Sequence, residues 1–162
     1  KRLSPKKQTL IFELGNLYVA WGKLDQALTV FKEAFDLEPR FVEARQAYAL
    51  GAIYAKEADL LAELIAGSNN PNFLADDRFI NAFAATKQYD RLIELWQKKV
   101  EQEPANALFR TSLAMSYWAN GQKQKAIMEM QKSVELDPSL KTEADKAIEA
   151  IKRGLSFEEV KR

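Results

Sequence analysis

Five prolines divide the sequence at nearly equal intervals. They are Pro5, Pro39, Pro71, Pro104 and Pro138, and the spacings between them are 34, 32, 33 and 34 residues. Proline ends a helix because it has no N–H to donate and because its ring clashes with the preceding turn. A stop signal at this interval indicates a chain of repeated supersecondary units rather than one closed core.

Each interval contains two stretches of helical periodicity separated by a turn. In the first and last intervals the turn contains a glycine, Gly22 or Gly121, and glycine adopts the left-handed conformation that ends a helix. After the turn, small or apolar residues recur at helical spacing; they are Ala27, Phe31 and Ala34, then Leu61 and Ile65, then Leu92 and Trp96, then Ala126 and Met130. Each block is therefore expected to form two helices of about a dozen residues each.

The first and last blocks resemble the tetratricopeptide repeat. The first has Leu14-Gly15-Asn16-Leu17-Tyr18, Gly22, Ala27, Phe31, Ala34 and Leu37-Glu38-Pro39, and the last has Leu113-Ala114, Tyr117, Gly121, Ala126 and Leu136-Asp137-Pro138. The resemblance extends more weakly to the two inner blocks. It implies an all-α fold in which antiparallel helix pairs stack into a right-handed superhelix. The repeats are expected at about residues 6–39, 40–71, 72–104 and 105–138.

The two inner blocks depart from this pattern. Gly67-Ser68-Asn69-Asn70-Pro71 stands where the second helix of the second block should end, so this helix is predicted to be about one turn short. In the third block Asn81 replaces the small residue of the other blocks, and the expected core contains Phe79, Phe83 and Trp96.

A capping helix is expected after the last repeat, over about residues 140–154. Its apolar face consists of Leu140, Ala144, Ala147, Ile148, Ile151 and Leu155, and lysines and glutamates occupy most of the rest. A repeat array needs such a terminal helix to cover its last apolar face. Gly154 ends the helix, and residues 155–162 are expected to form a short tail of a single array over residues 1–162. No comparable cap precedes the first block, which favours a fragment of a longer polypeptide.

The composition argues against most kinds of chemistry. The net charge is +1, from 24 basic and 23 acidic residues that are interspersed, whereas nucleic-acid binders usually show a basic stripe. The chain has no cysteine and no histidine, so the commonest ligands of transition metals and the commonest general base are missing. The paired carboxylates Asp76 and Asp77 are expected to cap a helix. We therefore predict no catalysis, no cofactor and no metal, and no uncharged run approaches the ~18–20 residues of a membrane span.

The tetratricopeptide resemblance implies that the first helix of each pair lines a concave groove. The residues predicted to contact a partner there are Phe12, Asn16, Leu50, Ile53, Arg78, Asn81, Met115 and Trp118. For Trp118 two interpretations stay open, a place in the groove and a place in the core. Tyr117 already fills the core position, and successive helical residues point about 100° apart. Asn16 and Arg78 match the repeats that bind chaperone carboxyl termini, but Phe12, Leu50 and Leu74 replace the other ligands, which argues against that subclass.

Two functions follow from the groove and from a second resemblance. The first is a scaffold that binds a peptide or partner protein in a largely apolar groove. The alternative is a structural or regulatory appendage that docks on a larger polypeptide, because the segments 76–80 and 89–96 are similar to repeats that trail bacterial O-antigen-ligase-like membrane proteins. The compartment is left open between the cytoplasm and the exposed part of such a membrane protein.

The stability of the second block can be tested by hydrogen exchange. Each repeat contributes its own term to the stability of an array, so the repeat with the shortened helix should open first. Apart from the chain ends, backbone amides in residues 60–72 are expected to exchange fastest. Equal protection in all four blocks would contradict this expectation.

Overall fold

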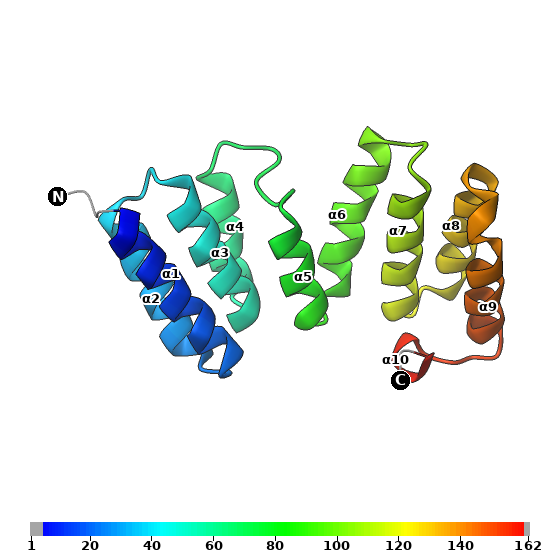
Figure 1. Cartoon of the computed structure of the whole chain (residues 1–162), viewed down its shortest axis with the longest axis horizontal. Helices are drawn as coiled ribbons and strands as arrows, with labels where there is room; N and C mark the ends of the chain where they lie inside the picture. Colours follow the sequence, from blue (N-terminus) through cyan, green and yellow to red (C-terminus); the bar gives the residue numbers. More distant parts are fainter. Residues whose placement is uncertain (1–4, 161–162) are drawn as a thin grey trace. The chain divides into compact units, whose positions relative to one another are not determined.

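The computed structural model describes residues 5–160, and every regular element in this range is helical (Figure 1). The α-helices are α1 (Pro5–Ala20), α2 (Leu24–Leu37), α3 (Val42–Ala55), α4 (Ala58–Ala66), α5 (Asp77–Ala85), α6 (Tyr89–Gln102), α7 (Ala107–Ala119), α8 (Lys123–Leu136), α9 (Lys141–Lys152) and α10 (Phe157–Val160). A 3-10 turn, η1 (Pro138–Leu140), precedes α9. The predicted all-α fold class is confirmed; residues 1–4 and 161–162 of the predicted domain lie outside the described residues.

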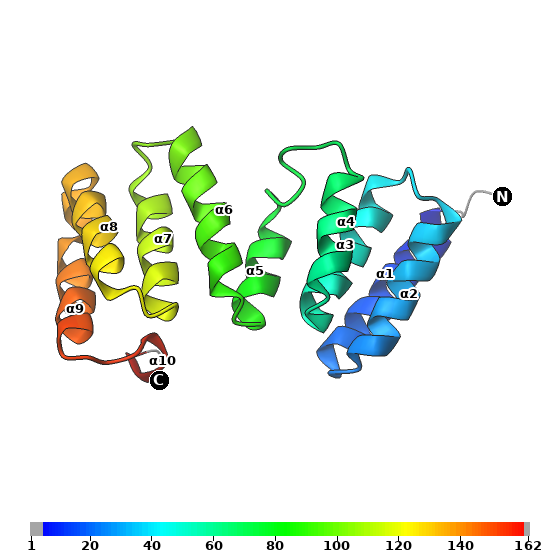
Figure 2. The same cartoon turned by 180° about the vertical axis from the view of Figure 1, so that it is seen from behind.

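The backbone forms two compact units, which meet in sequence between Thr86 and Lys87. In the first unit α1 pairs with α2 and α3 pairs with α4, while α3 also packs against α1, α2 and α5. Within this unit α1 and α3 form one layer, which is nearer in Figure 1, and α2 and α4 form the other, which is nearer in Figure 2. The first helices of successive hairpins therefore lie side by side, as a helical repeat requires.

One aromatic side chain fills the space between the first two hairpins. The ring of Phe31, on α2, is 1% exposed and reaches between α1 and α3. A Cβ atom added to Gly51 would lie 2.8 Å from Cδ2 of this ring, and one added to Gly15 would collide with the ring as well. Glycine is required at both crossings because only a backbone without a side chain leaves room for the ring.

The second helix of the second hairpin is short, as the sequence indicates. Helix α4 has 9 residues, whereas α2, α6 and α8 have 14 each. The chain then turns through residues 67–75, where Asn69 has a φ of 50° and the backbone N–H of Asn72 donates to Oδ1 of Asn70 at 2.9 Å. Phe73 anchors this loop, since it is 2% exposed and its ring centroid lies 5.7 Å from that of Phe79.

The core of the second unit is built from α6, α7, α8 and α9. Its largest buried side chains are Ile93, Leu113, Tyr117, Trp118, Met130 and Ile151. Residues 155–160, which were expected to form a short tail, contain a further helix. Gly154 turns the chain with a φ of 84°, and α10 begins three residues later. Leu155 and Phe157 of this segment pack against the core.

The glycine at the first crossing can be tested by substitution. Gly15→Ala should lower the free energy of unfolding by about 1–2 kcal/mol, because overpacking against Phe31 outweighs the better helix propensity of alanine. The equivalent pair in the last hairpin is Ala114 and Met130, both in the buried core. The double variant Gly15→Ala/Phe31→Met should therefore be more stable than the two single effects predict, as measured by denaturant unfolding. A Gly15→Ala variant that is at least as stable as the parent would contradict the packing argument.

Candidate functional site

The eight candidate groove residues lie on the first helices of the hairpins. Phe12 and Asn16 are on α1, Leu50 and Ile53 on α3, Arg78 and Asn81 on α5, and Met115 and Trp118 on α7. Because α3 packs against both α1 and α5, the six candidates of the first unit are on neighbouring helices. Met115 and Trp118 belong to the second unit.

Two candidates on α3 are not accessible. Leu50 is 9% exposed and Ile53 is 1% exposed, so their predicted place in an open groove is wrong. The reason is the central position of α3, which packs against α1, α2, α4 and α5. With neighbours on so many sides, 8 of the 14 residues of α3 are buried, including every residue from Ala47 to Ile53.

The exposed candidates of the first unit are mostly polar. Asn16, Arg78 and Asn81 are exposed and Phe12 is half-buried. Nη2 of Arg78 donates to Oε1 of Gln46 at 3.1 Å and so joins α5 to α3. Gln46 and Arg78 each stand seven residues after the proline of the preceding block. Equivalent positions of successive hairpins therefore meet on this face.

Asp76 holds the guanidinium of Arg78 in place. Nε of Arg78 donates to Oδ1 of Asp76 at 3.0 Å, and Nη2 donates to Oδ2 at 2.8 Å. The same carboxylate caps α5 by accepting from the backbone N–H of Arg78 at 2.8 Å, so the predicted capping role of Asp76 is confirmed. The hydrogen bonds from Arg78 lower the pKa of Asp76. The two side chains together are electrically neutral, and the Arg78 side chain is still 53% exposed.

Trp118 is a core residue of the second unit. It is 3% exposed, so the interpretation that placed it in an open groove is wrong. Its indole Nε1 donates to the carbonyl oxygen of Leu155 at 3.1 Å, and its ring centroid lies 5.6 Å from that of Phe157 in an edge-to-face arrangement. The segment after α9 therefore covers it. Met115 is half-buried and lines a cavity of about 50 Å³ beside Met130.

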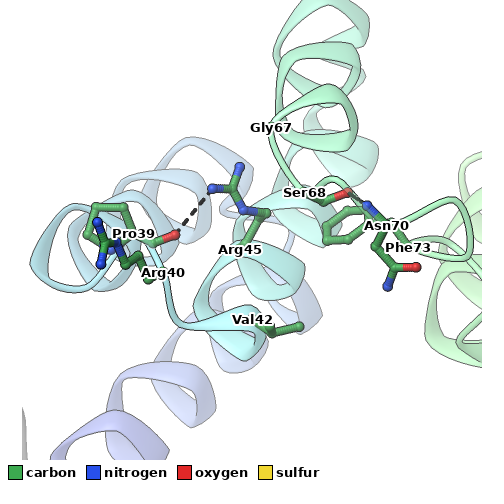
Figure 3. A pocket seen from close by; sticks show the side chains of 8 residues that line it. All are labelled: Pro39, Arg40, Val42, Arg45, Gly67, Ser68, Asn70 and Phe73. Atoms are coloured by element: carbon green, nitrogen blue, oxygen red, sulfur yellow. Dashed lines mark hydrogen bonds between the residues drawn. The ribbon is translucent and has the colours of Figure 1, made fainter.

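A pocket of about 240 Å³ opens between the start of α3 and the loop after α4 (Figure 3). Arg45 lines this pocket, and its Nη2 donates to the carbonyl oxygen of Pro39 at 3.2 Å. Arg110 makes the same contact with the carbonyl oxygen of Pro104 at 3.1 Å, and each arginine stands six residues after its proline. Because the contact recurs in both hairpins, Arg45 stabilises the turn, and the pocket is part of the repeat architecture.

Neither a metal centre nor a membrane span is visible within residues 5–160. No group of three or more acidic side chains there is arranged to hold a metal ion. None of the helices in this range combines the length and the apolar character needed to cross a bilayer.

The segment that covers Trp118 differs from the short tail expected from the sequence. Glu159 makes the glutamate half of a capping box: its Oε2 accepts from the backbone N–H of Ser156 at 2.6 Å and also from the Ser156 hydroxyl at 2.7 Å. The signal was present in the sequence, because a serine followed three residues later by a glutamate is typical of a helix start. These contacts also lower the pKa of Glu159.

Comparisons with known proteins agree with this fold. Residues 9–41 and 109–140 match the family model of the tetratricopeptide repeat. Among solved structures, the MamA RS-1 ArsTM double mutant is 19% identical, with a TM-score of 0.53 over 91% of this chain and 96% of that chain. The 41-end form of MamA from Desulfovibrio magneticus RS-1 is also 19% identical, with a TM-score of 0.52 and the same coverage. At this identity the likeness concerns the fold alone, which is a tetratricopeptide-type helical solenoid.

The comparisons give two further results. The comparison with curated proteins gives no significant match. The predicted resemblance to O-antigen-ligase-like proteins is not supported by any of the similarities found.

The core position of Trp118 can be tested against a matched tryptophan. Trp118→Ala should lower the free energy of unfolding by about 3–5 kcal/mol, because it leaves a cavity and exposes the apolar side of Phe157. Trp21→Ala should change it by less than about 1 kcal/mol, since Trp21 is 61% exposed. Denaturant unfolding measures both variants, and similar values for the two would contradict the burial of Trp118.

Proposed function

We propose that this chain is a protein-interaction scaffold, not an enzyme, that binds an extended peptide segment of a partner along the first-helix face of its first unit. The residues that would contact the peptide are Phe12 and Asn16 of α1 and Arg78 and Asn81 of α5. Leu50 and Ile53 would support this face from below, since both are buried. The half-buried Met115 and the covered Trp118 belong to the second unit.

The observation on which the proposal rests is the fixed position of the Arg78 guanidinium. Asp76 and Gln46 hold Nε and Nη2, so the side chain loses little freedom when it binds a ligand. Its Nη1 makes no hydrogen bond with any described residue and can donate to an incoming group. A preorganised donor on an exposed face reduces the entropy cost of binding.

The local chemistry favours a peptide backbone over a phosphate or a free carboxylate. Asp76 neutralises Arg78, so the site has no net positive charge to attract an anion. The exposed amides of Asn16 and Asn81 each offer a donor and an acceptor, which matches the alternating N–H and C=O groups of an extended chain. The half-buried ring of Phe12 adds the apolar contact that a partner side chain would use.

The alternative function, docking on a larger polypeptide, is favoured by a different face of α1. Leu10, Leu14, Leu17 and Trp21 are 63%, 40%, 48% and 61% exposed, and their spacing places them in one row along the helix. A contiguous row of exposed apolar side chains marks an interaction surface. The occupant that fits such a row is an amphipathic helix whose apolar residues have the same spacing.

Selection of peptide ligands tests the proposed groove. Short random peptides displayed on phage would be selected against the intact chain, and the binders mapped by amide chemical shifts. If the peptide binds to this face, the backbone amide resonances of Phe12, Asn16 and Asn81 should shift. Arg78→Ala should weaken binding at least about tenfold, because hydrogen bonds from a charged donor are lost.

Arg91→Ala is the matched control. Arg91 is similarly exposed at 45% and pairs with Glu94 at 3.1 Å on α6, so its removal should leave peptide affinity unchanged. Equal affinity of the Arg78→Ala variant and the parent would exclude the groove. Binders that become helical on binding and perturb Leu10, Leu14 and Leu17 would instead support docking through α1.

A further inference from the structure

The segment after α9 returns to a hairpin that the chain has already formed. Gly154 ends α9, and the backbone N–H of Leu155 donates to the carbonyl oxygen of Ala150 at 3.1 Å. The chain then turns back, and α10 packs against α7. Both views show α10 beside the end of α7 (Figures 1 and 2). Residues 155–160 therefore lie on the surface of the second unit as a ligand would, and we call them the returning segment.

The returning segment contacts Trp118 through its backbone and one ring. The carbonyl oxygen of Leu155 accepts from the indole Nε1 at 3.1 Å. The ring of Phe157 packs edge-to-face on the indole with an interplanar angle of 77°. This pairing satisfies both the apolar ring and the polar N–H of a tryptophan, which is how aromatic anchors are recognised at protein interfaces.

A second contact lies at the start of α6. Oε1 of Glu158 accepts from Nζ of Lys87 at 3.0 Å and from the hydroxyl of Tyr89 at 3.1 Å. The contact with Glu158 raises the pKa of Lys87. Burial, and then the hydrogen bond to Glu158, raises the pKa of Tyr89. The surface under the returning segment thus has an aromatic part at Trp118, which Phe157 contacts, and a cationic part at Lys87, which Glu158 contacts.

The returning segment is held weakly compared with the rest of the second unit. Helix α10 has four residues, far fewer than an isolated helix needs to be stable. The ion pair between Lys87 and Glu158 is exposed, with side-chain exposures of 64% and 52%, and exposed pairs contribute little to stability. A segment with one four-residue helix and exposed polar contacts opens more often than the hairpins do.

We infer that the returning segment occupies in cis a binding site for partner proteins, and that the site recognises an aromatic residue followed by an acidic residue. The aromatic ring binds Trp118, the acidic side chain binds Lys87 and Tyr89, and the indole N–H binds a backbone carbonyl two residues before the ring. This site lies on the second unit and is separate from the peptide face proposed for the first unit. A partner with this pattern displaces the segment and binds in its place.

A peptide added in trans tests this inference. The probe is a synthetic peptide with the sequence of residues 154–160, titrated calorimetrically into the full chain and into its Phe157→Ala variant. The variant should bind the peptide at least about tenfold more tightly than the parent, because its own segment competes less. Binding should shift the indole N–H resonance of Trp118. A peptide with alanine in place of the phenylalanine should not bind.

Two further variants make the result decisive. Val160→Ala is the matched control, since Val160 is in the same segment but 48% exposed, and it should bind the peptide as the parent does. If Phe157→Ala fails to fold, Glu158→Lys loosens the exposed end of the segment instead. The inference is overturned if no variant binds the peptide or if the Trp118 resonance does not move. It is also overturned if the parent forms dimers that exchange this segment, because a second copy would then be the occupant.

Discussion

The first unit depends on the contact of one phenylalanine ring with two glycines. Phe31 projects from α2 between the backbones of α1 and α3, where Gly15 and Gly51 have no side chain. Both first helices therefore approach the same ring, and the size of that ring sets the distance between the hairpins. Since α3 in turn packs on α5, the positions of Asn16, Gln46 and Arg78 on the exposed face follow from this contact.

Much of the fold could be predicted because it follows from local rules. Proline and glycine determine where helices end, so the short α4 and the turns at Gly22 and Gly121 could be predicted from individual residues. The N-terminal cap of α5 was equally local, because Asp76 accepts a hydrogen bond from a backbone two residues away. Such features depend on a few neighbouring residues, and their physics does not change with the tertiary context.

The candidate site was harder to predict because accessibility depends on distant parts of the chain. Leu50 and Ile53 have the spacing of groove residues, but α3 has neighbours on four helices and buries them. Trp118 is covered by residues almost forty positions later in the sequence. Arg78 is exposed, as its position in the repeat predicts, but only the structure shows that it donates a hydrogen bond to Gln46.

Comparison of equivalent positions separates structural contacts from specific ones. Arg45 and Arg110 bind the carbonyl oxygens of Pro39 and Pro104 in two different hairpins, so this contact belongs to the repeat itself. The contact of Arg78 with Gln46 and that of Trp118 with the returning segment each occur only once among the described residues. A contact that recurs in different hairpins is explained by its contribution to the stability of each hairpin. A contact that does not recur needs a separate cause, and in both units these contacts lie on the first helix of a pair. The same architecture therefore differs between the units, because the first leaves its polar face open and the second covers Trp118 with its own chain.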